Sequence, residues 1–227
     1  MASMQDIADM VGISKGAVSL VLSGKAGHRV SDETKAKVFE AAQSLNYRVN
    51  EVARTLRTGQ SRIISVIVTD ISNEFFGKLV FYIQEEAKKH GYLVLTANSN
   101  ESAEEFEEIV NMLLGKKVDG IISVTPPGGA ETMAHIVDLG IPLVQVDRLC
   151  GGLEADYVGV GNYGSTYDMI SGMIKDSYCK IAMVSLDLDV NPIHERCSAY
   201  RDAMAANGFK DNILEVFIRY GEGSRTG

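Results

Sequence analysis

The sequence predicts two parts: an all-α headpiece with a helix-turn-helix motif, and an α/β body on a doubly wound parallel sheet whose second lobe is incomplete. The headpiece prediction rests on two short amphipathic segments that meet at Gly12. The body prediction rests on apolar, β-branched runs after Arg62, which alternate with helical segments as in parallel α/β proteins. The two parts also carry opposite net charge.

The headpiece opens with two helices joined by a tight turn. Ser3 lies three residues before Asp6, as in a capping box, Gly12 ends the first helix, and Ser14 can cap the second. Apolar stripes would join the two helices through Met4, Ile7, Ala8, Val11, Val18, Val21 and Leu22. The exposed N-terminal half of the second helix would carry Lys15, Gly16, Ala17 and Ser19. In such a motif this half enters the major groove of DNA.

A third helix is predicted over residues 31–45, with Asp32 and Glu33 in its first turn. One of its faces carries Thr34, Val38, Ala41, Ala42 and Leu45. Three such helices can enclose a small core. A helical hairpin used only for packing is the alternative, because short amphipathic helix pairs are common.

Strands alternate with helices from Arg62 onward. Residues 63–69 are a continuous apolar run, typical of a strand buried on both faces of a parallel sheet. The first lobe is expected to contain strand 63–69, helix 75–90, strand 92–97, helix 103–114, strand 120–124, helix 130–139 and strand 143–146. The second lobe, from about Gly161, is expected to follow strand 157–160 with helix 165–175, strand 180–186, helix 192–207 and strand 214–219. This alternation predicts right-handed crossovers in a doubly wound sheet.

Ligands of such sheets bind beyond the carboxyl ends of the strands. The segments that directly follow predicted strands are residues 70–76, residues 98–100, Thr125 and Asp147. These positions are therefore the candidates for a small-molecule pocket.

Three segments, DIADMVGISKGAVSLVLSG, VSDETKAKVFEAAQSLNYRVN and EVARTLRTG, occur in this order. They resemble the lac-repressor/galactose-repressor (LacI/GalR) family of bacterial transcription regulators in sequence and spacing, and the resemblance extends more loosely to the end of the chain. The resemblance implies a periplasmic-binding-protein-like body. It also implies a homodimer that binds a pseudo-palindromic operator in double-stranded DNA, as a repressor, under the control of a small-molecule effector such as a sugar.

The resemblance assigns roles to residues of the headpiece and of the segment after it. Residues 51–57 would be the hinge helix, which folds in the minor groove, and Leu56 would be the apolar wedge that opens a base step. An ordinary linker leucine is the alternative. The implied DNA-binding residues are Met4, Ser14, Lys15, Gly16, Ala17, Ser19, Leu20, His28, Tyr47, Asn50, Ala53, Leu56 and Arg57.

Three positions depart from the family pattern. Leu20 stands where better-known members often carry Arg or His, and Gly16 has no side chain. The operator half-site therefore cannot be copied from those members, although Leu20 could contact a thymine methyl. Val49 stands where many members have Pro, which leaves the entry to the hinge less rigid.

The segment DISNEFF resembles the family's strand-end loop, whose aromatic pair lies at the cleft. The implied effector-binding residues are Asp70, Asn73, Phe75, Phe76, Asn98, Asp147 and, from the second lobe, Arg196. The alternatives are a helix-start core role for Phe75 or Phe76, a turn or cap role for Asp147, and a surface ion pair for Arg196. The chemistry of the effector, and whether it releases or tightens DNA, stays open.

Charge is unevenly distributed along the chain. Residues 1–62 contain nine Lys and Arg and six Asp and Glu, a net charge of +3. Since the whole chain carries −8, the remainder carries −11. A basic headpiece on an acidic body would orient the chain on polyanionic DNA, although a solvated asymmetry without function is the alternative.

An enzyme is the main competing interpretation. Gly159, Gly161 and Gly164 form G-x-G-x-x-G between a strand and a helix, with Asp187 after the next strand, as in an NAD(P)-binding oxidoreductase. No catalytic set accompanies the motif, and the four histidines do not cluster along the sequence. We expect no enzyme, no cofactor and no metal. A freestanding sugar-binding protein is a third possibility, which the basic headpiece disfavours.

The remaining features indicate the cellular compartment. Cys150, Cys179 and Cys197 are odd in number and lack C-x-x-C spacing, which favours reduced thiols. The sequence contains no export signal or apolar run of membrane-spanning length, so we expect a cytoplasmic protein without a membrane partner.

The expected domains are a headpiece at 1–49, a hinge helix and linker at 50–60, a first lobe at 61–161 and a partial second lobe at 162–227. Family members normally continue beyond this point. We therefore expect a truncated chain in which residues 164–227 are mobile and expose apolar strands. A self-sufficient small layer over residues 165–219 is the alternative.

Overall fold

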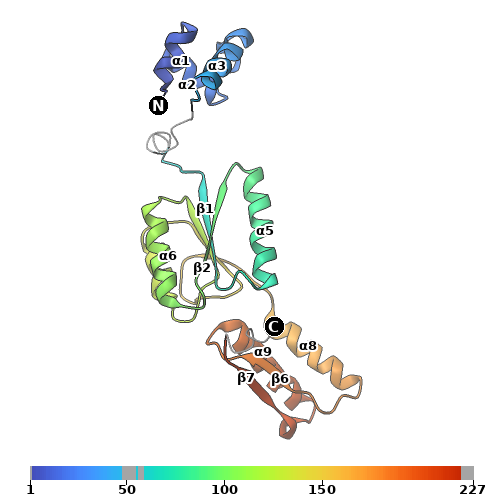
Figure 1. Cartoon of the computed structure of the whole chain (residues 1–227). Coiled ribbons are helices and arrows are strands. Elements are labelled where there is room, and N and C mark those ends of the chain that lie inside the picture. Colours follow the sequence, from blue (N-terminus) through green and yellow to red (C-terminus); the bar gives the residue numbers. More distant parts are fainter. Residues whose placement is uncertain (1, 48–54, 56–58, 221–227) are drawn as a thin grey trace. The chain divides into compact units, whose positions relative to one another are not determined.

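The computed structural model describes residues 2–47, 55 and 59–220, and the elements are labelled in Figure 1. The chain divides into two compact units, Met1–Gly59 and Gln60–Gly227. Apart from Thr55, the predicted hinge helix at 51–57 lies outside the described residues, and so do Asn50, Ala53, Leu56 and Arg57.

The first unit is a three-helix headpiece. Its elements are α1 (Met4–Val11), α2 (Lys15–Leu22), a 3-10 turn (Gly27–Arg29) and α3 (Asp32–Ser44). The predicted capping box is confirmed, because Ser3 N–H donates to Asp6 Oδ2 at 2.7 Å while Ser3 Oγ accepts from the Asp6 N–H. Gly12 ends α1 with a φ of +75°, a conformation that favours glycine. The core consists of Ile7, Ala8, Val18, Val21, Ala26, Val38 and Ala41.

The second unit contains a five-stranded parallel sheet of order β2-β1-β3-β4-β5. Its strands are β1 (Ile63–Val68), β2 (Leu93–Asn98), β3 (Gly120–Ser123), β4 (Leu143–Val146) and β5 (Asp156–Val158). Three helices follow the first strands, namely α5 (Glu74–Lys89), α6 (Ala103–Gly115) and α7 (Ala130–Asp138). This order confirms the predicted doubly wound sheet.

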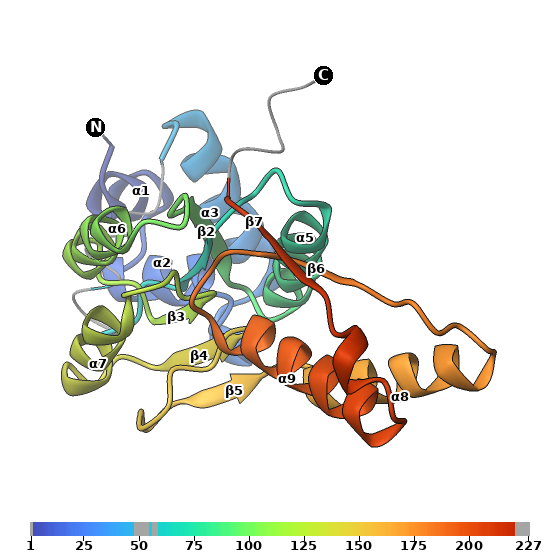
Figure 2. The same cartoon turned by 90° about the horizontal axis from the view of Figure 1, so that it is seen from below.

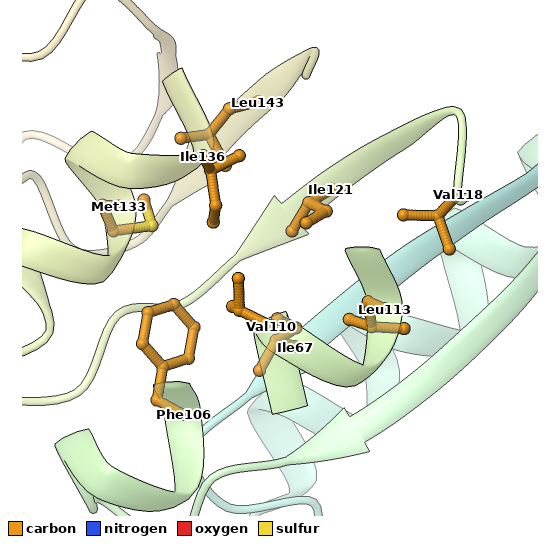
Figure 3. Close-up of a cluster of buried hydrophobic side chains, with 9 residues drawn as sticks. All are labelled: Ile67, Phe106, Val110, Leu113, Val118, Ile121, Met133, Ile136 and Leu143. Atoms are coloured by element: carbon orange, nitrogen blue, oxygen red, sulfur yellow. The ribbon is translucent and has the colours of Figure 1, made fainter. Parts of the chain in front are cut away.

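Helices cover both faces of this sheet (Figure 2). On one face, α6 and α7 pack against the strands through the cluster shown in Figure 3: Ile67, Phe106, Val110, Leu113, Val118, Ile121, Met133, Ile136 and Leu143. On the other face, α5 buries Phe76 and Val80 against Val66, Val68 and Val146. Burial on both faces explains the continuous apolar sequence of β1.

A second, smaller layer follows β5. It contains α8 (Asn162–Lys175), β6 (Met183–Leu186), α9 (Asn191–Ala206), a 3-10 turn (Lys210–Asn212) and β7 (Glu215–Ile218). Tyr200 is fully buried at its centre, and the Tyr200 hydroxyl donates to the Ile181 carbonyl at 2.8 Å and accepts from the Leu214 N–H at 2.9 Å. This buried tyrosine ties α9 to the segments that lead into both strands.

Strands β6 and β7 pair in parallel as a separate two-stranded sheet, and one face of this sheet is apolar and exposed. Val184 pairs with Val216 and Leu186 pairs with Ile218, so these four side chains share one face. Each is between 41% and 58% exposed. Parallel strands are normally covered on both faces, so this lobe is incomplete, as the sequence predicted. The mobility expected for residues 164–227 stays a prediction.

Some predicted boundaries are wrong. The helix expected from Ser165 begins at Asn162, whose buried side chain bonds Arg196, and the strand expected from Lys180 begins at Met183. The main chain before Met183 is held instead by Tyr200, which contacts the Ile181 carbonyl.

The Asp119 carboxylate holds the two residues that precede β1. Asp119 accepts hydrogen bonds from Ser61 N–H at 2.7 Å, Ser61 Oγ at 2.8 Å and Arg62 N–H at 2.9 Å. Burial would raise the pKa of Asp119, but these hydrogen bonds outweigh burial and hold the pKa below its usual value. Ser61 and Arg62, near the start of the second unit, are thus anchored beside β3.

The described residues contain neither a membrane-spanning helix nor a cluster of metal ligands. In this part of the chain, no helix is both long and apolar enough to cross a bilayer. Over the same residues, no three His, Cys, Asp or Glu side chains gather as a metal site requires.

Candidate nucleic-acid interface and ligand cleft

The N-terminal half of α2 presents a concave, exposed surface. Ser14 caps the helix, since its Oγ accepts from the Ala17 N–H at 3.2 Å. The concavity is lined by Met4, Lys15, Gly16, Ser19 and Leu20. Five of the predicted DNA-binding residues therefore share one surface, and Ser14 and Ala17 form the cap beside it.

The chemistry of this surface suits a polyanion with an accessible groove. Lys15 is exposed at the start of a helix, where the unsatisfied N–H groups carry partial positive charge. A Cβ built on Gly16 would meet nothing closer than Ser14 Oγ at 3.8 Å, so the space beside this glycine is open. A base pair could approach the helix backbone here more closely than it could beside a larger residue.

The other predicted DNA-binding residues are more scattered. His28 is exposed in the 3-10 turn after α2, whereas Tyr47 is half-buried and packs against the headpiece core. Tyr47 therefore contributes to headpiece packing as well as to any contact with DNA.

A cleft of about 300 Å³ lies between the two layers of the body. Six of the seven predicted effector residues line it, namely Asp70, Asn73, Phe75, Phe76, Asp147 and Arg196. Further lining residues include Glu101, Arg148, Val160, Val190, Ile193 and Tyr220. Its volume is at the small end of the range for ligand pockets, which suits a metabolite.

The loop after β1 supplies one wall. Asp70 Oδ1 accepts from the Ser72 hydroxyl at 2.6 Å, and this bond lowers the pKa of Asp70 below its usual value although burial opposes it. Asn73 caps α5 by accepting from the Phe75 N–H at 3.0 Å. Phe75 is 53% exposed and lies edge-on to the buried Phe76, with ring centroids 5.1 Å apart. One aromatic ring is thus available to a ligand and the other supports it.

Asp147 follows β4 in a left-handed conformation, with a φ of +62°. Its N–H donates to the Val158 carbonyl at 2.9 Å, and its carbonyl accepts from the Tyr157 hydroxyl at 3.0 Å. Burial raises the pKa of the Asp147 carboxyl, against the opposing charges of Arg148 and Arg196. Such backbone strain is concentrated at functional sites.

Glu101 and Arg148 form a buried ion pair that the sequence analysis missed. The Arg148 guanidinium donates from Nη1 to Glu101 Oε2 at 2.5 Å and from Nη2 to Glu101 Oε1 at 2.6 Å. A further bond joins Nη1 to the Thr125 carbonyl at 3.2 Å. Glu101 directly follows residues 98–100, and Arg148 directly follows Asp147. Their position next to these predicted pocket segments could have identified them from the sequence.

Arg196 enters from α9, and its Nε donates to Asn162 Oδ1 at 2.8 Å. Asn162 is 3% exposed and lies 34 residues from Arg196, so no local pattern predicts that it orients this arginine. Asn98 does not line the cleft. Its Oδ1 accepts from the Ile71 N–H at 2.8 Å, and its amide bonds Asn100, so it holds the loop after β1 in place.

A second hollow of about 450 Å³ lies on the smaller layer, beside α9 and β7. Three of its ionisable side chains are paired, since His194 Nε2 lies 3.2 Å from Asp189 Oδ1 and Arg201 Nε lies 2.9 Å from Glu215 Oε2. The cleft between the layers is the stronger ligand site, because its aromatic ring and carboxylates face the space.

The glycine motif does not form a dinucleotide-binding unit. Gly164 lies within α8, and the strand before this helix, β5, belongs to the five-stranded sheet. The strand after the helix, β6, pairs with β7 in the separate two-stranded sheet. A dinucleotide fold needs both strands in one sheet, so this geometry disfavours the oxidoreductase interpretation.

Two family models match the chain in the two regions described above. Residues 3–50 match "Bacterial regulatory proteins, lacI family", and residues 64–224 match "Periplasmic binding protein domain". The chain belongs to the LacI family. The LacI match covers all three headpiece helices, and the periplasmic-binding-protein match covers both layers of the body.

Individual LacI-family relatives agree with this assignment. The chain is 27% identical over 222 residues to a probable HTH-type transcriptional regulator EndR from Paenibacillus polymyxa, covering 96% of this chain and 64% of that protein. The lac repressor dimer bound to operator and an anti-inducer has a TM-score of 0.77 at 21% identity, covering 96% of this chain and 64% of that one.

A sugar complex is also among the similar structures. The Cra transcriptional dual regulator from Pseudomonas putida, in complex with fructose 1-phosphate, has a TM-score of 0.64 at 14% identity, covering 70% of this chain and 58% of that one. These two structures show the fold that this chain shares. The chain spans a little under two thirds of the length of the first of these relatives.

Proposed function

We propose that this LacI-family chain is a sequence-specific DNA-binding transcriptional regulator, acting as a repressor on a pseudo-palindromic operator. The observation that carries the proposal is the exposed concave surface at the start of α2, where Lys15, Gly16, Ser19 and Leu20 lie together. This surface belongs to the part of the chain with net positive charge. Phosphate contacts supply affinity and register, and the side chains of α2 contact base edges in the major groove.

In this regulator, residues 1–49 are the headpiece, 50–60 the hinge helix and linker, 61–161 the first lobe and 162–227 the partial second lobe. Leu56 in the hinge segment is the minor-groove wedge, and Leu56→Ala weakens operator binding and reduces bending of the DNA. If wild type and Leu56→Ala bend the operator by the same angle in a circular-permutation gel, this role is contradicted. A DNA partner also places the protein in the cytoplasm.

Selection from random-sequence DNA tests the main proposal. The full chain should recover a two-fold symmetric site, and the affinity measured by fluorescence anisotropy should fall steeply with salt, since bound phosphates release counterions. Lys15→Ala should weaken binding by about tenfold, as expected for a lost charged contact. Lys116→Ala is the matched control, because it removes the same charge from the end of α6. Recovery of no symmetric site, or equal effects of the two substitutions, would contradict the proposal.

A homodimer is part of the same proposal, because a two-fold operator requires two headpieces. The dimer surface is the exposed apolar group on α5 and the neighbouring β2, where Phe81, Tyr82 and Leu93 are each at least 57% exposed. Phe81→Glu should shift the molar mass in sedimentation equilibrium toward the monomer. Met112→Glu, on an equally exposed site of α6, should leave the mass unchanged. A mass insensitive to Phe81→Glu would exclude this surface.

The cleft binds the effector, a small sugar or related metabolite, and the chain carries out no reaction on it. Phe75 offers a ring face, Asp70 and Asp147 accept hydroxyl hydrogen bonds, and Arg196 donates from the second layer. Effector binding biases the DNA-binding state through linkage between the two sites. A thermal-shift screen of sugars against the full chain, repeated with Arg196→Ala, tests this part. A hit whose affinity Arg196→Ala leaves unchanged would show that the cleft is not the site.

A further inference from the structure

The charges of the cleft are arranged so that one of its two arginines is cancelled. Among the described residues that line the cleft, the basic side chains are Arg148 and Arg196. Both outer nitrogens of Arg148 bond the Glu101 carboxylate, and the side chains of this pair are 9% and 6% exposed. The Thr125 carbonyl takes a further N–H of Arg148. Arg148 therefore presents a neutralised pair, and not a cation, to a ligand.

The charges left for a ligand are two carboxylates and one guanidinium. Asp70 is held ionised by its hydrogen bonds with Ser72. Asp147 and Arg196 face the same space. This remainder has no positive surplus with which to balance a phosphate or a carboxylate of a ligand.

We infer that the cleft accepts uncharged polyhydroxylated molecules and rejects sugar phosphates and sugar acids, and that Glu101 sets this selectivity by cancelling Arg148. The inference rests on the proposed function, in which this cleft is the effector site. Hydroxyl groups donate to the carboxylates of Asp70 and Asp147 and accept from Arg196 without adding charge. A phosphate group would bring up to two negative charges beside those carboxylates in a partly desolvated space, where like charges repel more strongly than in water.

The position of Glu101 is specific to this role. Asn100 and Glu101 have φ values of +51° and +57°, and this left-handed turn carries the carboxylate to an arginine 47 residues further along the chain. Two successive non-glycine residues in this conformation are unusual and are maintained only where the surroundings support them. The bidentate bonds from Arg148 support Glu101, and the Asn100 amide donates to Glu105 Oε2 at 2.6 Å.

Isothermal titration of the full-length chain with matched pairs of compounds tests the inference. The pairs are glucose and glucose 6-phosphate, ribose and ribose 5-phosphate, fructose and fructose 1-phosphate, and glucose and gluconate. At least one uncharged member should bind, and its charged partner should bind at least about tenfold more weakly. A charged member that binds as tightly as its uncharged partner would overturn the inference and leave the cleft as the effector site. Binding of neither class would overturn the proposed effector function, and the inference with it.

Two variants separate the role of Glu101 from general electrostatics. Glu101→Gln releases the charge of Arg148, and Asp70→Asn removes one carboxylate while keeping a similar shape. The measured quantity is the ratio of the affinity for the charged compound to the affinity for its uncharged partner. Each variant should raise this ratio by about tenfold. Glu104→Gln makes the same charge change on the exposed start of α6 and should leave the ratio unchanged.

Circular dichroism melts establish that each variant is folded before titration. If Glu101→Gln does not fold, Asp70→Asn alone tests whether the negative charge of the cleft excludes charged ligands. An unchanged ratio in a folded Glu101→Gln protein, or in Asp70→Asn, would contradict the inference. A ratio that rises equally in Glu104→Gln would contradict it as well, because net charge alone would then account for the selectivity.

Discussion

Glu101→Ala should destabilise the body by about 3–5 kcal/mol, because it leaves the Arg148 guanidinium buried without a counter-charge. The structure supports a value in this range. The two N–O distances are 2.5 and 2.6 Å, and the two side chains are 6% and 9% exposed, so the guanidinium loses two short charge-assisted bonds at a site where solvation is poor. With a urea dependence of about 2 kcal/mol per molar, the denaturation midpoint should fall by about 1.5–2.5 M.

A double substitution distinguishes an unpaired charge from simple loss of packing. Replacing both partners, Glu101→Leu with Arg148→Met, removes the buried charges together and should recover most of the stability. Glu74→Ala breaks an exposed ion pair with Lys78 on α5 and should leave the midpoint nearly unchanged. A midpoint shift in Glu101→Ala no larger than that in Glu74→Ala, or a double variant as unstable as the single one, would show that no unpaired charge is left buried.

Three further predictions concern the headpiece, the entry into the body and the outer sheet face. Gly16→Ala should stabilise the headpiece by about 0.5–1 kcal/mol in a thermal melt but weaken operator binding, because the methyl group occupies the groove-facing space; equal operator affinity would exclude close approach there. The lowered pKa of Asp119 means that its contribution to stability is present above about pH 4 and is lost as the pH falls through that pKa. Urea denaturation should therefore show the difference between wild type and Asp119→Asn shrinking below pH 4, and a constant difference would refute this. Val184→Thr with Val216→Thr should reduce binding of a hydrophobic dye, and unchanged dye binding would mean that the face is already covered.

Local chemistry in the sequence was sufficient for most of the elements. The capping residues Ser3 and Ser14 and the turn at Gly12 located α1 and α2, because caps and left-handed glycines act within a few residues. The apolar run of β1 indicated a strand buried on both faces, and the alternation after it indicated a parallel sheet. The start of α8 was predicted three residues too late, and the bond from Arg196 to Asn162 joins positions 34 residues apart, which local patterns do not reveal.

The candidate cleft was predictable only in outline. The rule that ligands bind beyond strand ends located Asp70 and Asp147 correctly at the cleft, since it depends on topology alone. The same rule included Asn98, whose side chain instead supports a neighbouring loop. The pairing of Glu101 with Arg148 depends on backbone conformations that periodicity does not reveal.

The central claim is that the exposed start of α2 contacts bases, and a change of specificity tests it most directly. Leu20 lines the concave surface of α2 and has no hydrogen-bonding group to offer a base edge. Selection from random DNA should be run in parallel with the wild type and with Leu20→Arg. The account predicts two-fold symmetric consensus sites that differ at one or two symmetry-related positions, with guanine favoured there by the arginine. Identical consensus sites for the two proteins, or no consensus for either, would contradict the claim.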